Sequence, residues 1–158
     1  MGQVVVVRGR LARRVREEAE KLGITPDEYL VELLSQGLDP KGKAVEYIEA
    51  ARELLEEARE ELGKGDVRQA AEKLWGAAAL AVKAYAWWRE GRRLTSHGEL
   101  WRYIDRMAEE IGDWVRDAFY AGHAMHTCFY EAWCTEEGAK ASLARVEKLV
   151  REIENRVK

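Results

Sequence analysis

One polar stripe in the sequence carries the side chains best suited to chemistry. At roughly 100° per residue along a helix, one face of the segment 114–133 presents Arg116, Tyr120, His123, Thr127 and Tyr130. Histidine transfers protons near neutral pH, and arginine binds anionic oxygens with a fixed fork of donors. A face that is polar but little charged is typical of a pocket or a subunit interface. A hydrogen-bond network between helices is an equally weighted alternative.

The three histidines raise the question of a metal site. His123 and His126 are three residues apart on one expected helix, so both side chains could reach one ion. A zinc site needs a third protein ligand, and only the fold could bring His97 or Glu131 to that position. We therefore predict no metal and no other cofactor. His126 is expected to pack toward a neighbouring helix, and His97 to lie at a capped helix start.

Composition restricts the class of protein. The 158 residues fit one compact domain with a short appendage, and 47% apolar with 35% charged residues allow a core and a charged surface. The net charge of −3 gives no global attraction to nucleic acid or to an anionic membrane.

No signal peptide and no membrane span are recognised, so a cytoplasmic location is expected. Cys128 and Cys134 are predicted to be buried or free thiols in a reducing compartment. The dense Glu, Lys and Arg are typical of a thermophile.

The first 40 residues predict a dimerisation arm. Four consecutive valines favour a strand over residues 3–8, and a helix over about 10–22 follows. Thr25, Pro26 and Glu28 predict a capped second helix. This order resembles a ribbon-helix-helix module, in which two strands pair across a dimer. The strand is apolar on both faces, which favours burial over base reading. A basic cluster leaves DNA as a less favoured partner: Arg8, Arg10, Arg13, Arg14 and Arg16.

The remaining chain, 41–158, predicts an antiparallel helical bundle, so the fold class is all-α with a short strand-helix-helix arm. Helices are expected over about 43–62, 67–90, 96–111, 114–133 and 136–157, after a linker at 38–40. Capping residues mark two of the starts, Asp66 with Gln69 and Ser96 with Glu99. The connections are short, so successive helices should run antiparallel.

Three segments of this bundle resemble the HEPN superfamily, and more closely its archaeal PaREP branch. They are Ala70-Ala71-Glu72-Lys73-Leu74-Trp75-Gly76-Ala77-Ala78, Ser96-His97-Gly98-Glu99-Leu100-Trp101, and Gly122-His123-Ala124-Met125-His126 leading to Phe129-Tyr130-Glu131. The resemblance covers about three quarters of the chain.

The resemblance implies a metal-independent endoribonuclease. Many HEPN domains carry an arginine, a polar residue and a downstream histidine, and Arg116-Asp117 with His123 fits the longest form, with six residues between Arg and His. In that superfamily the pair from each subunit faces a cleft across a dimer. We therefore expect a homodimer or a higher even oligomer, with Arg116 and His123 as catalytic residues. Binding residues would be Tyr120, His126, Thr127 and Tyr130, and the substrate RNA or a nucleotide. The alternative is a non-catalytic module that binds a nucleotide or a partner, because many members of the superfamily are thought to be inactive.

Overall fold

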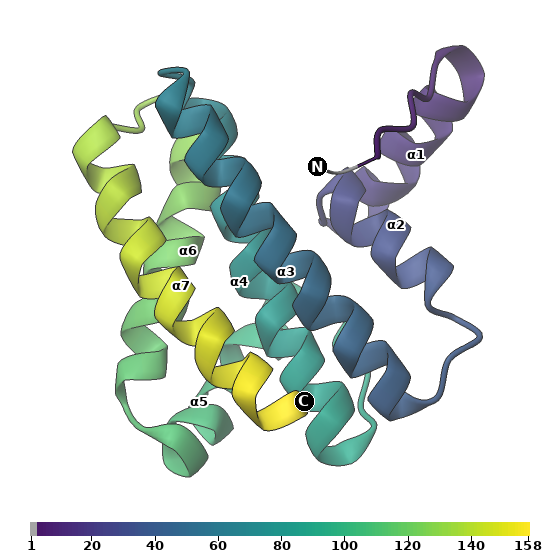
Figure 1. Ribbon diagram of the computed structural model, residues 1–158, viewed down its shortest axis with the longest axis vertical. Coiled ribbons are helices and arrows are strands. Elements are labelled where there is room, and N and C mark those ends of the chain that lie inside the picture. Colours follow the sequence, from purple (N-terminus) through teal and green to yellow (C-terminus); the bar gives the residue numbers. More distant parts are fainter. Residues whose placement is uncertain (1–2) are drawn as a thin grey trace.

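The computed structural model describes residues 3–158 and contains seven α-helices (Figure 1). Two short helices, α1 (Gly9–Leu22) and α2 (Pro26–Leu34), form an arm. Five longer helices form the bundle: α3 (Pro40–Gly63), α4 (Val67–Glu90), α5 (His97–Ile111), α6 (Trp114–Glu131) and α7 (Glu136–Val157). The all-α prediction is confirmed, and none of the helices described is long and apolar enough to cross a membrane.

Helix α4 is the centre of the bundle, because α3, α6 and α7 all pack against it. Its alanines are buried along most of its length, and small side chains let neighbouring helices approach closely. Gly122 gives the clearest case: a Cβ added there would lie 2.6 Å from the Cβ of Ala78. The stripe of α6 is therefore held at a fixed position against α4.

The arm lies at one side of the bundle, beside α3 (Figure 1). Among the helices, α1 packs only against α2, while α2 also touches α3 and α4. The contact with α4 includes a buried ion pair, in which Lys83 Nζ lies 3.0 Å from Glu28 Oε2, with side-chain exposures of 5% and 1%. A further contact joins the turn between α1 and α2 to α5, where the His97 ring nitrogen Nε2 lies 2.9 Å from the carbonyl oxygen of Gly23.

The predicted N-terminal strand is absent from the described residues. Residues 3–8 are irregular, although Arg8 has extended backbone angles, and Val4, Val5 and Val6 are 85%, 86% and 67% exposed. The physical reason is that a strand needs a partner for its N–H and C=O groups, and no neighbouring segment supplies one within residues 3–158. Within residues 3–158 the arm therefore consists of two helices and no strand.

The helix starts follow the capping residues. Thr25, Asp66 and Ser96 accept hydrogen bonds from backbone N–H groups three residues later, as predicted. The expected linker at 38–40 is wrong in part, because Asp39 caps α3 and Pro40 is its first residue. Glu28 does not complete a reciprocal capping box, since its carboxylate pairs with Lys83.

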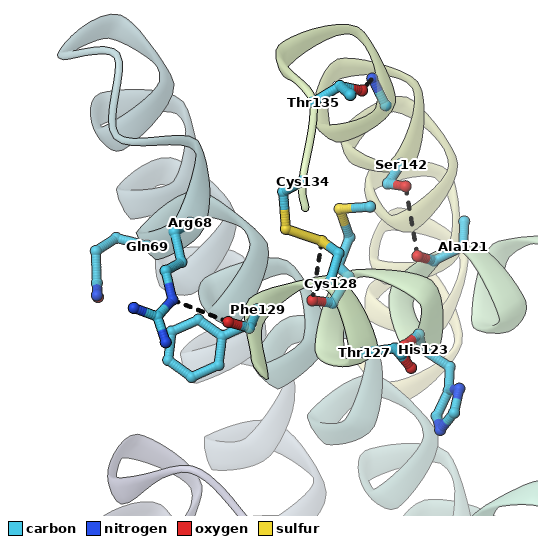
Figure 2. Close-up of a disulfide and its surroundings, with 12 residues drawn as sticks. Arg68, Gln69, Ala121, His123, Thr127, Cys128, Phe129, Cys134, Thr135 and Ser142 are labelled. Carbon is cyan, nitrogen blue, oxygen red and sulfur yellow. Dashed lines mark hydrogen bonds between the residues drawn. A yellow bond between two sulfur atoms is a disulfide. The ribbon is translucent and has the colours of Figure 1, made fainter. Parts of the chain in front are cut away.

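The prediction of two free thiols is also wrong. Helix α6 ends at Glu131, two residues earlier than expected, and Ala132 has left-handed backbone angles that turn the chain toward α7. This turn brings Cys134 back to the end of α6, where it forms a disulfide with Cys128 (Figure 2). The Cα atoms of the pair are 5.0 Å apart, within the range that a disulfide spans. The bond fixes the C-terminal end of the helix that carries the polar stripe.

Candidate functional site

The three histidines come together around one tryptophan. Trp75 of α4 is buried, and its ring centroid lies 5.5, 5.4 and 5.1 Å from those of His97, His123 and His126. The histidine centroids are 5.2 to 6.4 Å from one another. All three rings are half-buried. This arrangement confirms that His126 packs toward a neighbouring helix and that His97 lies at the capped start of α5.

An aromatic pair extends this histidine cluster along α6. The ring of Tyr120 stacks on that of Trp101, with centroids 4.9 Å apart, and Trp101 meets His123 edge-on at 5.1 Å. Both Tyr120 and Trp101 are exposed. We call these two residues the aromatic platform. Its flat, solvent-facing rings are the kind of surface on which unpaired bases stack.

Arg116 lies two turns before His123 on the same face of α6, and two carboxylates hold its guanidinium. Nε donates to Asp113 at 2.9 Å, and Nη1 donates to Asp105 of α5. Hydrogen bonds to Asp105 and Asp113 raise the pKa of Arg116, so the group stays charged. Tyr120 lies one turn after Arg116 on α6, and Trp101, which stacks on Tyr120, meets His123 edge-on.

The two remaining residues of the polar stripe, Thr127 and Tyr130, make different contacts. The Thr127 hydroxyl donates to the carbonyl oxygen of His123 at 3.3 Å, so it is used within its own helix. Tyr130 is 67% exposed, and its ring meets His126 edge-on at 5.1 Å. Arg68 of α4 reaches the end of α6, where its Nε donates to the carbonyl oxygen of Phe129 (Figure 2).

Burial controls the protonation of two of the histidines. Burial, and then the proximity of His97, lowers the pKa of His123. Burial, His97 and His123 together lower the pKa of His126 to about 4. At neutral pH both rings are therefore neutral and able to accept a proton. No group of three or more His, Cys, Asp and Glu side chains in residues 3–158 is arranged to hold a metal ion.

We expect acid to destabilise the protein through His126. Its pKa is about 4 in the folded state, below the usual 6.5 or so of the unfolded chain. Between these values the unfolded state binds more protons, so the free energy of unfolding falls as pH is lowered through this window. Urea unfolding at about pH 7 and about pH 5 measures the loss. His126→Gln should reduce the pH dependence, and an equal loss in both proteins would contradict this assignment.

Sequence reasoning identified the α6 stripe but missed its partners on other helices. Trp75 and Trp101 were recognised only as parts of the segments that resemble the HEPN superfamily, and Asp105 had no predicted role. The position of Trp101, four residues after His97 on α5, was the one available signal, because residues at this spacing share a helix face.

The comparisons with known proteins identify the family. No curated protein and no solved structure matches the chain. The model of the archaeal PaREP1/PaREP8 family matches residues 46–150, which run from the first turns of α3 into α7 and include every stripe residue. The chain belongs to the archaeal PaREP1/PaREP8 family.

Proposed function

We propose that this protein is a dimeric, HEPN-like RNA-binding protein that cleaves RNA without a metal, with His123 as proton acceptor and Arg116 as phosphate ligand. The observation that carries the proposal is the meeting of neutral histidine rings and an exposed aromatic platform on one face. Single-stranded RNA offers unstacked bases to aromatic rings. A neutral imidazole beside the backbone can accept the proton of a ribose 2′-hydroxyl.

The proposed reaction forms one P–O bond and breaks another, and it needs neither a redox partner nor a metal ion. His123 takes the proton of the 2′-hydroxyl, and the 2′-oxygen attacks the adjacent phosphorus. The bond from phosphorus to the 5′-oxygen breaks, and the leaving oxygen takes a proton from water. The products are a 2′,3′-cyclic phosphate and a 5′-hydroxyl, and His123 returns its proton to solvent.

The hydrogen-bond donors of Arg116 support its proposed role as phosphate ligand. A guanidinium has five N–H groups, and Asp113 and Asp105 take one each from Nε and Nη1. The remaining donors are available to a phosphate, and the two carboxylates keep the side chain oriented. Charge-assisted hydrogen bonds of this kind stabilise the negative charge of a phosphorane-like transition state.

The alternative is a module that binds RNA or a nucleotide without cleaving it. The ion pairs of Arg116 with Asp105 and Asp113 favour this alternative. The two carboxylates already balance the positive charge of Arg116, which cleavage would need to stabilise the transition state. Incubating single-stranded RNA with the protein in excess chelator distinguishes cleavage from binding alone. The proposal expects fragments ending in 2′,3′-cyclic phosphate, whereas intact RNA that co-purifies with the protein would leave only binding.

Dimerisation is proposed from the exposed valines. Val4 to Val7 are exposed by 40% or more, and fully burying one such side chain is worth roughly 1.5–3 kcal/mol. The segment from a second copy would supply the missing strand partner and cover these side chains. Light scattering should therefore show a dimer, and Val5→Lys with Val7→Lys should shift it toward monomer. Leu34→Lys, at a residue of α2 that is 82% exposed, is the matched control. A wild-type monomer at micromolar concentration would contradict the proposal.

A further inference from the structure

A cavity of about 430 Å³ lies where the arm meets the bundle. Its walls come from α1, the turn between α1 and α2, α4 and the end of α6. The side chains that line it include Arg16, Gln69, Glu72, His126, Phe129 and Tyr130. The volume is within the range of sites that hold small ligands.

We propose that this cavity holds a guanine base of single-stranded RNA, with Glu72 reading its Watson–Crick edge; this inference rests on the proposed RNA-cleaving function. The cavity is thus the specificity site for that reaction.

Glu72 supplies the discrimination. The side chain is half-buried, and burial raises its pKa although the charges of Lys73 and Arg68 act in the opposite direction. Within residues 3–158 no hydrogen bond contributes to stabilising its charged form. A carboxylate has two acceptor oxygens and no donor. Guanine alone among the four bases presents two adjacent donors, N1–H and N2–H. Adenine and cytosine place an acceptor beside their donor, and uracil has one donor between two carbonyl oxygens.

The other walls suit a flat base and its phosphate. Phe129 and Tyr130 present aromatic rings, and the Arg68 guanidinium lies 4.8 Å from the centroid of the Phe129 ring, which fixes that side of the cavity. Stacking on such rings tolerates every base, so it adds affinity and leaves most of the choice of base to Glu72. Arg16 places a positive charge at the same cavity for a phosphate.

The cavity is connected to the histidine cluster through one side chain. His126 lines the cavity, and its ring centroid is 5.9 Å from that of His123. A base seated in the cavity would therefore direct its ribose and phosphate toward His123. Cleavage is expected next to guanine.

Binding of the four nucleoside 5′-monophosphates, measured by calorimetry on the full chain, tests the inference. We expect guanosine monophosphate to bind about tenfold or more tighter than the other three, as a lost bidentate base contact implies. Glu72→Gln, which replaces one acceptor with a donor, should abolish this preference while the melting curve is retained. The matched control is Glu109→Gln, at an exposed carboxylate of α5 outside the cavity, and it should keep the preference.

The remaining outcomes separate this inference from the function on which it rests. Guanine-selective binding without any RNA cleavage would leave the cavity site standing and overturn the proposed reaction. Cleavage at all four nucleotides alike, or equal affinity for the four monophosphates, would overturn the guanine site and leave the reaction. Failure to bind guanosine monophosphate would also overturn the site.

Discussion

Replacing His123 by alanine is expected to lower the rate of RNA cleavage by about 100-fold or more while the protein stays folded. General base catalysis by a positioned side chain contributes roughly 10²–10⁴-fold, and alanine removes the group that accepts the 2′-hydroxyl proton. His123 is half-buried, and its ring contacts the rings of Trp75 and Trp101. Within residues 3–158 the ring makes no hydrogen bond whose loss would unfold the protein. The rate is measured in chelator on a single-stranded RNA containing guanine.

Two further variants test whether the lower cleavage rate of His123→Ala reflects the loss of the proton acceptor. His123→Gln keeps a polar side chain of similar size and should be as inactive as the alanine variant, which excludes a cavity effect as the cause. Ala124→Ser changes an exposed residue beside it on α6 and should keep the wild-type rate. Equal cleavage by wild type and both His123 variants would mean that a contaminating nuclease or another residue does the chemistry.

Replacing Lys83 by methionine is expected to lower the free energy of unfolding by about 3–5 kcal/mol, the usual cost of leaving one charge of a buried pair without its partner. Lys83 and Glu28 are nearly inaccessible to solvent, and the second carboxylate oxygen of Glu28, Oε1, has no hydrogen-bond partner among the described residues. The variant leaves that carboxylate buried against α4. Urea unfolding followed by circular dichroism measures the loss.

The double variant Lys83→Met with Glu28→Leu should recover most of the stability, because replacing both charges by apolar groups is often neutral. Lys140→Met is the matched control, since Lys140 pairs with Glu136 at the surface, where both side chains are 54% exposed. Such exposed pairs contribute about 0–1 kcal/mol. A loss for Lys83→Met no larger than for Lys140→Met would show that the ion pair does not hold the arm.

The bundle was predictable because its signals are local. Ser96 before α5, Asp66 before α4 and the short connections between helices act over three or four residues, so they are visible in the sequence. The polar stripe of α6 was predictable for the same reason, since helical periodicity alone places Arg116, His123 and Tyr130 on one face.

The features that the sequence did not predict depend on contacts between segments that lie far apart in the chain. The Glu28 carboxylate forgoes its local cap because Lys83, 55 residues later, offers an ion pair. The partner of Arg116 on α5, Asp105, is set by the packing of two helices, as is the meeting of His97 with Trp75. The valine segment fails as a strand for a different reason: its preference for extended structure is local, but its hydrogen bonds need a second segment.

The most direct test of the RNA site is the response of the histidine rings to RNA that cannot be cleaved. A guanine-containing oligonucleotide with 2′-O-methyl groups lacks the attacking hydroxyl and should remain bound. Side-chain NMR of the histidines should then show saturable shifts of the His123 and His126 ring signals, with assignment from His123→Gln and His126→Gln. Binding of this RNA without any change at either ring would contradict the account.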